Sequence, residues 1–387
     1  MPLRDLITIL LSTFLALAAL YSPQPLLPFF AKTFSVSEAA SASIISWSLL
    51  SMSIGPLFTG YFLQRYSPKQ MYAWCLFGLA CSTLAFAATT SIGWMKVVRF
   101  VQGGMVSALL ATTMTYIAGA PGSLRQVMGY YVGASVMGGL MGRIIAGFVS
   151  QYADWRFFFV VLGIALVLCF ILSLKLQETQ SDAEKGKPKP FEISQFLRVL
   201  QDPYIHRMYL VIMCAFFVMT GILNFVPFRL EELDATIGES TISLFYLGFI
   251  AGFFVSINAP RIADLVGGTF KAAWVGMGFV LVGLAIGCIP STGAIFFAVM
   301  LATSGFFLQH TSIATMLNGY AGKQAGNVNS LYISIYYAGG SAGSYVPGLL
   351  YISAGWLYFT GLLALFVVMS FMLAMTIRVP GNAFLSR

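Results

Sequence analysis

Charged side chains are scarce in this sequence. Asp, Glu, Lys and Arg together make up 9% of its 387 residues, whereas 58% of the residues are hydrophobic. Soluble globular proteins carry about 25% charged residues, so this composition excludes an ordinary soluble fold. Apolar stretches of about 18 residues or more follow one another, and each can cross a bilayer core of about 30 Å. Backbone polar groups must be satisfied internally there, so the sequence predicts an all-α membrane protein.

Signatures of enzymes and of nucleic-acid binding are missing as well. There is no P-loop, no Gly-x-Ser-x-Gly elbow with partners and no cluster of metal ligands, so we expect no enzymatic activity, no cofactor and no metal. The five cysteines fall inside apolar stretches, which indicates small core residues rather than disulfides. The net charge of +8 comes mostly from short loops and lacks a basic patch with stacking aromatics, so nucleic acid is not an expected partner.

Twelve membrane spans are predicted, with one long polar interruption between the sixth and the seventh. The expected spans are 6–31, 38–63, 70–90, 93–118, 126–150, 155–175, 205–230, 239–261, 269–289, 291–317, 326–350 and 354–376. This pattern predicts an N-terminal six-helix bundle (1–176), a cytoplasmic linker (177–203) and a C-terminal six-helix bundle (204–387). Within the linker, residues 191–200 are expected to form a short amphipathic helix on the membrane surface.

The basic residues predict the orientation of the chain. Most lysines and arginines fall in loops on one side of the membrane, and only Lys32, Lys96, Arg156 and Arg229 fall near the other side. Positively charged loops stay in the cytoplasm, so both termini and the linker are expected to be cytoplasmic. An even number of spans is required for this, in agreement with twelve.

A glycine-lined segment occurs twice, once in each predicted bundle. The first copy has Gly138, Gly139, Gly142 and Gly147 followed by Trp155, and the second has Gly339, Gly340, Gly343 and Gly348 followed by Trp356. The spacing of all five markers is the same, which indicates a duplicated bundle. Glycines at this spacing let neighbouring helices approach closely. They are explained by ordinary packing or by surfaces that slide or seal between the two halves, and both explanations can hold together. The copies differ at Arg143, which Ser344 replaces.

Ionisable groups inside the predicted spans are few and basic. The thirteen acids all lie at or near span ends or in loops, whereas Arg99, Arg143 and His310 lie within spans. A charge at membrane depth costs a few kcal/mol and usually faces a partner or a cavity. Arg143 is therefore a candidate for anion recognition, and the alternative is a structural arginine. Arg99 has the same structural alternative, namely bonding to a neighbouring backbone.

His310 is the only group inside the spans that titrates near neutral pH. It is either a satisfied core histidine or a group that binds protons or substrate. Polar and aromatic residues of the spans complete a set expected to line a midplane cavity between the two halves. The predicted substrate-binding residues are Gln24, Arg143, Asn224, His310, Tyr332 and Tyr336.

Several stretches together resemble the major facilitator superfamily, most closely the YnfM-like branch of the drug:proton antiporters. They are the segments 21–28, 99–103, 138–143, 305–310 and 330–340. In the family's loop between spans two and three, Gln64 stands where the family has an aspartate, before Arg65 and with Lys69 following. The mirrored loop keeps its acid at Asp264. The resemblance implies gating roles for Arg65, Lys69 and Asp264 and a role in proton transfer for Arg99.

The resemblance also implies two six-helix bundles and alternating access. The expected function is proton-driven export of a drug-like molecule or metabolite by a monomer in the bacterial inner membrane. His310 and Arg99 would couple protons, and Arg143 would favour an anionic or zwitterionic substrate. The alternatives are a proton-coupled uptake symporter for a sugar or organic acid, and a non-transporting sensor or scramblase.

Overall fold

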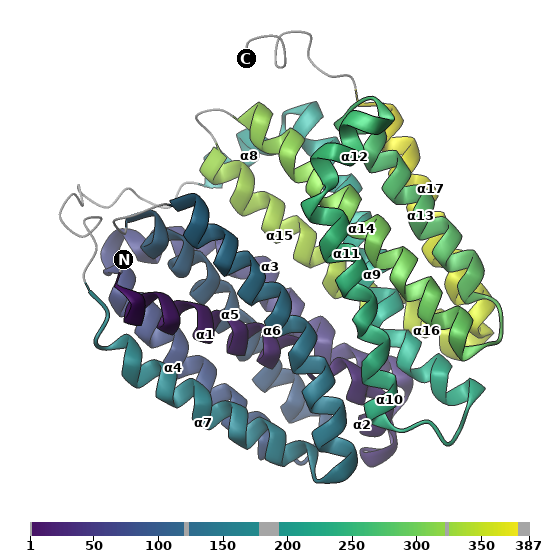
Figure 1. Ribbon diagram of the computed structural model, residues 1–387, viewed down its shortest axis with the longest axis horizontal. Helices are drawn as coiled ribbons and strands as arrows, with labels where there is room; N and C mark the ends of the chain where they lie inside the picture. Colours follow the sequence, from purple (N-terminus) through teal and green to yellow (C-terminus); the bar gives the residue numbers. More distant parts are fainter. Residues whose placement is uncertain (1, 120–123, 178–192, 322–324, 378–387) are drawn as a thin grey trace. The chain divides into compact units, whose positions relative to one another are not determined.

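The computed structural model describes residues 2–119, 124–177, 193–321 and 325–377, and these segments contain helices and no strands (Figure 1). The helices of the first half are α1 (Leu3–Tyr21), the 3₁₀ turn η1 (Gln24–Leu26), α2 (Leu27–Thr33), α3 (Glu38–Arg65), α4 (Pro68–Ala87), α5 (Ile92–Gly119), α6 (Leu124–Tyr152) and α7 (Trp155–Ser173). Those of the second half are α8 (Ile193–Leu200), α9 (Pro203–Leu233), α10 (Glu239–Leu244), the 3₁₀ turn η3 (Phe245–Leu247), α11 (Gly248–Ile257), α12 (Ala259–Val266), α13 (Thr269–Gly287), α14 (Thr292–Ala321), α15 (Ala325–Gly343), α16 (Val346–Ala354) and α17 (Trp356–Met375).

The number of membrane spans agrees with the prediction of twelve. Eleven helical segments of the described chain are long and apolar enough to cross a membrane. The predicted span 326–350 corresponds to α15 and α16, which are separated at Ser344 and Tyr345. α15 has 19 residues but is too polar to be counted with the other eleven. The helix predicted within residues 191–200 is α8, whereas most of the predicted linker lies outside the described residues.

The first span is broken in its middle. α1 ends at Tyr21, and the 3₁₀ turn η1 separates it from α2. Pro23 and Pro25 occupy this break, and a proline lacks the N–H that a continuous helix needs. Pro227, in contrast, lies inside the uninterrupted α9. The break exposes backbone and side-chain groups between residues 19 and 24 to side chains of other helices.

Contacts divide the chain into two compact units. Unit 1 comprises Met1–Val36, Ser43–Phe191 and Gly238–Leu244, and unit 2 comprises Ser37–Ala42, Glu192–Ile237 and Phe245–Arg387. Each unit therefore corresponds to six spans, except that each of two short segments is assigned to the unit of the other half. The beginning of α3 is assigned to unit 2 and α10 to unit 1. The boundaries 1–176 and 204–387 remain a prediction of where the two bundles begin and end.

The first glycine of the duplicated segment makes the same kind of contact in both units. In unit 1, a Cβ atom at Gly138 would overlap the backbone of Phe14 on α1. In unit 2, a Cβ atom at Gly339 would overlap the backbone of Met213 on α9. α6 therefore packs on α1 as α15 packs on α9. Close packing between helices accounts for these glycines.

Candidate functional site

Arg143 lies at the centre of a polar cluster in unit 1. Its Nε donates a hydrogen bond to Oε1 of Gln24 at 2.6 Å, and its Nη1 donates to the carbonyl of Gly139 at 2.7 Å. Its guanidinium carbon lies 4.4 Å from the ring centroid of Tyr21. Only 2% of the Arg143 residue surface is exposed. A buried guanidinium is thus held by an amide, a carbonyl dipole and the face of an aromatic ring.

Local structure brings these groups together. Tyr21 is the last residue of α1 and Gln24 the first of the following 3₁₀ turn, so the break places both beside α6. Gly142 precedes Arg143, and a Cβ atom there would lie 2.5 Å from the Cα of Ala18. The absent side chain allows α1 to approach α6 closely enough for the guanidinium to reach Gln24. The sequence motif and the broken helix therefore build one site.

Arg99 belongs to a second network in the same unit. It is fully buried on α5 and donates hydrogen bonds to the carbonyls of Ala19 and Leu20, at the end of α1. It also donates to the side chains of Ser48 on α3, at 2.9 Å, and Gln102 on α5. These bonds join three helices at the break in α1. They fit the structural alternative for Arg99, and its proposed role in proton transfer remains a prediction.

His310, Tyr332 and Tyr336 meet in an aromatic cluster of unit 2. The ring centroid of His310 lies 5.8 Å from that of Tyr332 and 5.3 Å from that of Tyr336. Phe216 of α9 stacks on Tyr336 with centroids 3.8 Å apart and planes at 9°. Phe306 of α14 lies 5.8 Å from His310 and 5.9 Å from Phe216. Three helices, α9, α14 and α15, thus contribute to one group of rings.

Asn224 is fully buried on α9, eight residues after Phe216. A helix rises about 1.5 Å per residue, so Asn224 lies about 12 Å further along the axis. Within each unit, the predicted substrate-binding residues are grouped as follows. Gln24 and Arg143 are in contact in unit 1, His310, Tyr332 and Tyr336 are in contact in unit 2, and Asn224 lies at a different level of unit 2.

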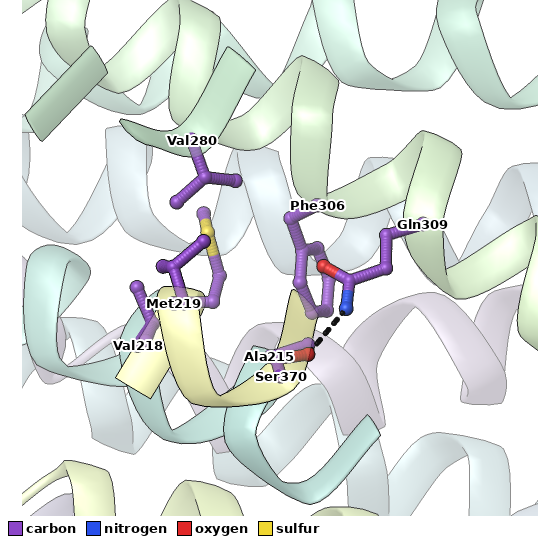
Figure 2. Close-up of a pocket in the computed structure, with 8 residues that line it drawn as sticks. Ala215, Val218, Met219, Val280, Phe306, Gln309 and Ser370 are labelled. Carbon is purple, nitrogen blue, oxygen red and sulfur yellow. Dashed lines mark hydrogen bonds between the residues drawn. The ribbon is translucent and has the colours of Figure 1, made fainter. Parts of the chain in front are cut away.

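A small internal cavity lies next to the aromatic cluster of unit 2. It is lined mostly by apolar side chains of α9, α13, α14 and α17, and its size suits about one water molecule. Figure 2 shows Phe306 and Gln309 side by side at this cavity, with the Gln309 amide donating a hydrogen bond to Ser370 at 3.2 Å. The cavity is too small for a substrate. Phe306 therefore lines this cavity and also lies beside His310.

Comparison with known protein families identifies the architecture that carries these clusters. The family model described as Major Facilitator Superfamily matches residues 9–344. The chain belongs to this superfamily. It is a membrane transporter and not an enzyme.

Relatives of the superfamily transporter match over almost its whole length. An uncharacterized transporter of Buchnera aphidicola subsp. Schizaphis graminum is 25% identical and is aligned over 96% of this chain and 91% of its own. The inner membrane transport protein YnfM of Escherichia coli is 24% identical over 91% of this chain and 85% of its own. The YnfM relationship confirms the resemblance identified in the sequence.

Solved structures support the same fold. The nucleoside transporter NupG has a TM-score of 0.80 at 12% identity, over 97% of this chain and 100% of the other. The human organic anion transporter MFSD10 has a TM-score of 0.68 at 19% identity, with the same coverage. At these identities the likeness concerns the major facilitator fold alone.

The predicted gating residues of the superfamily transporter lie at helix ends. Arg65 is the last residue of α3, and its guanidinium carbon is 4.5 Å from the ring centroid of Tyr61. Lys69 is the second residue of α4, and Asp264 is exposed on α12. None of the three forms an ion pair with another residue that the structure describes. Their gating roles remain predictions.

Sequence reasoning missed the buried residues that support the site. Phe216 and Phe306 hold the aromatic cluster in place, but phenylalanines are common in every apolar span, and the chain has 34 of them. Tyr21 belongs to the segment 21–28 that carries the family resemblance, whereas its contact with Arg143 depends on the break in α1. The prolines around this break indicate a possible interruption but do not locate it by themselves, because Pro227 lies inside the unbroken α9.

Proposed function

We propose that this major facilitator transporter is a proton-coupled exporter of small organic anions or zwitterions. Transport would proceed by alternating access, in the bacterial inner membrane and with both chain termini in the cytoplasm. The proposal goes beyond membership of the family, which establishes a membrane transporter and leaves substrate, coupling and direction open.

The observation that carries the proposal is the buried guanidinium of Arg143. Placing an arginine in the middle of a membrane helix costs about 2.5–3.5 kcal/mol or more. Its contacts with Gln24, Gly139 and Tyr21 fix the position of the guanidinium through neutral groups. The acidic residues of the sequence lie at span ends or in loops. An anionic group of a substrate would therefore meet a preoriented guanidinium at this site.

His310 supports the proposal for proton coupling. It is one of only two histidines in the sequence, and the other, His206, is exposed near the start of α9. His310 forms no hydrogen bond with another residue of the described chain, although it contacts three aromatic rings. Its imidazole nitrogens are thus able to exchange a proton with substrate or water, in the manner typical of histidine.

Coupled flux in proteoliposomes tests the proposed function. Benzenesulfonate serves as the probe because it is anionic at every working pH and does not cross the bilayer as a neutral acid. A pH-sensitive dye inside the vesicles would report proton movement when benzenesulfonate is added outside. Antiport moves protons outward as the anion enters. We expect this signal with the wild-type protein, and we expect its loss in Arg143→Ala and in His310→Ala.

The control variant is Arg198→Ala, whose side chain is exposed on α8. Protons that enter together with the anion would instead indicate the uptake symporter. Proton movement that is the same with and without protein would contradict proton-coupled transport of this anion class. A normal signal in Arg143→Ala would contradict the role of Arg143.

A further inference from the structure

We propose that the aromatic face of α15 in unit 2 is a subsite for a planar aromatic ring of the transported substrate. This inference rests on the proposed function, because it names the class of substrate for the same transporter. It depends on a different group of residues from Arg143, all of which belong to unit 2.

The rings of this face are held in a fixed arrangement. Tyr332 and Tyr336 lie one helical turn apart on α15, with planes at 14° and centroids 6.3 Å apart. Phe216 covers one side of Tyr336 at 3.8 Å, and Phe306 packs against Phe216 at 5.9 Å. Tyr337 meets Tyr336 edge to face at 5.0 Å. Such contacts lock each side chain in one orientation, so a ligand ring would not have to order them.

Some rings of this aromatic face are buried, and others keep part of their surface exposed. Phe216 and Phe306 are buried and form the base. His310, Tyr336 and Tyr337 are only partly buried, so they keep ring surface that other groups can reach. Aromatic surface that is rigid and still accessible is what stacking with a ligand requires.

α15 differs from the helices that face lipid. It is the long helix of the described chain that is too polar to be counted as a membrane span on composition. It contributes none of the large exposed apolar side chains, whereas α7 and α17 contribute many. Polar helices inside a membrane bundle face the interior or a water-filled passage. The partly buried tyrosines of α15 are thus suited to a solute rather than to an acyl chain.

Two polar groups at the aromatic face have unused hydrogen-bonding capacity. Tyr332 is 8% exposed, and its hydroxyl has no hydrogen-bond partner among the described residues. His310 also forms no hydrogen bond in this part of the chain. A purely apolar ring would leave both groups unsatisfied. The subsite therefore fits an aromatic ring with a polar substituent or ring heteroatom better than a plain hydrocarbon.

The chemistry distinguishes an aromatic ring from a saturated ring of similar size. Both bury a similar apolar area, but only the aromatic ring gains from stacked and edge-to-face geometry with Tyr336 and Tyr337. Aromatic pairs add enough to burial to change an affinity about three- to tenfold. The subsite thus predicts that, of two ligands with the same charge, the aromatic one binds more tightly than the saturated one.

Four permanently charged probes test this preference on the purified full-length protein. Benzenesulfonate and cyclohexanesulfonate form the anionic pair. Benzyltrimethylammonium and (cyclohexylmethyl)trimethylammonium form the cationic pair. Affinities come from the rise in melting temperature with probe concentration. We expect the aromatic member of the anionic pair to bind about three- to tenfold more tightly than its saturated counterpart.

Variants of Tyr336 connect the preference to the subsite. Tyr336→Leu keeps apolar bulk and removes the ring, so the preference should fall below about twofold. Tyr336→Phe keeps the ring and should retain the preference, which guards against a variant that merely folds poorly. Tyr358→Leu, an exposed tyrosine of α17, is the matched control and should behave as the wild-type protein.

Each remaining outcome decides for or against the subsite. No ring preference, including no stabilisation by any probe at millimolar concentration, would overturn it. A preference that survives Tyr336→Leu would overturn it as well. A ring preference confined to the cationic pair would support the subsite and contradict anion recognition by Arg143. Proton-coupled flux without ring preference would leave the proposed function standing and refute this inference alone.

Discussion

At the scale of single residues, the two buried arginines of unit 1 have different surroundings. Arg99 binds the carbonyls of Ala19 and Leu20 and two polar side chains, so its contacts connect the end of α1 to α3 and α5. Arg143 on α6 is held by the amide of Gln24, the carbonyl of Gly139 and the ring face of Tyr21. The contacts of Arg99 connect three helices, whereas those of Arg143 orient the guanidinium that we propose to recognise an anion. Stability and ligand binding should therefore respond differently to their substitution.

Arg99→Leu should destabilise the protein strongly. The substitution leaves the carbonyls of Ala19 and Leu20 and the Ser48 hydroxyl without their buried donor, and each such group costs about 1–3 kcal/mol. We expect a loss of at least about 2 kcal/mol, measured by denaturant or thermal unfolding in detergent. Arg198→Leu, at an exposed position of α8, is the control. Equal stability of the two variants would show that the Arg99 network does not hold the end of α1.

The hydroxyl groups of two buried tyrosines give a second prediction. Tyr209 donates a hydrogen bond to the carbonyl of Val328 at 2.7 Å, whereas the hydroxyl of Tyr332 has no partner in the described chain. Tyr209→Phe should lower the free energy of unfolding by about 1 kcal/mol or more. Tyr332→Phe removes a buried group that is already unsatisfied, so stability should stay within about 0.5 kcal/mol or rise. A larger loss for Tyr332→Phe would reveal a partner of that hydroxyl.

At the scale of helices, the repeated glycines set how closely neighbours pack. A Cβ atom at Gly138 would overlap the backbone of α1, and backbone cannot move aside as a flexible side chain does. A Cβ atom at Gly133, on the same helix, would meet nothing within 4 Å. Alanine substitutions at these two positions therefore distinguish the effect of helix propensity on stability from the effect of helix packing.

Gly138→Ala should destabilise the protein by about 1–3 kcal/mol through overpacking of α6 on α1. Gly133→Ala should have no such cost and could gain up to about 1 kcal/mol, because alanine favours a helix more than glycine does. Thermal unfolding of the two purified variants measures the difference. The same melting temperature for both would contradict the contact between α1 and α6.

Much of the helical architecture could be predicted from the sequence, because long apolar stretches leave only helices as a solution. The amphipathic α8 and the duplicated glycines were predicted as well. The breaks within the spans were not predicted. Hydropathy treats the first span as continuous, although α1 stops at Tyr21, and it also misses η3 in the eighth span. The Pro227 of an unbroken helix shows why proline alone does not locate such breaks.

The candidate site was predicted in part, for a related reason. Polar residues inside apolar spans stand out, so Arg143, Gln24, His310, Tyr332 and Tyr336 could be named from the sequence. Which of them touch each other depends on helix rotation and on the break in α1. Phe216 and Phe306 carry no signal in a sequence rich in phenylalanine. Asn224 looked equivalent to the others, yet it lies about 12 Å further along α9 than Phe216.

At the scale of the whole molecule, the two units are copies that have diverged at the sites of interest. Arg143 donates to the carbonyl four residues before it, and the corresponding Ser344 does the same at 2.8 Å. The bond from residue 143 or 344 to the preceding turn is therefore common to the two units. Gln102 of α5 bonds Thr83 of α4, whereas Gln309 of α14 bonds Ser370 of α17, so these two bonds join different pairs of helices. Unit 1 has a buried arginine at position 143 where unit 2 has Ser344.

The proposed orientation predicts which loops outside reagents can reach. Ser91 lies exposed between α4 and α5, and Gln70 lies exposed at the start of α4. In a cysteine-free background, Ser91→Cys should react with a membrane-impermeant maleimide added to whole cells, and Gln70→Cys should react only after the cells are opened. The reverse pattern would place both termini outside the cytoplasm.

The affinity of matched ions for Arg143→Gln tests the central claim most directly. Benzenesulfonate and benzyltrimethylammonium share a ring and differ in the sign of their charge. If the buried guanidinium recognises an anion, the substitution should weaken benzenesulfonate binding by about tenfold or more and change benzyltrimethylammonium binding by less than about twofold. An equal loss for both ions, or no loss for the anion, would contradict charge recognition at Arg143.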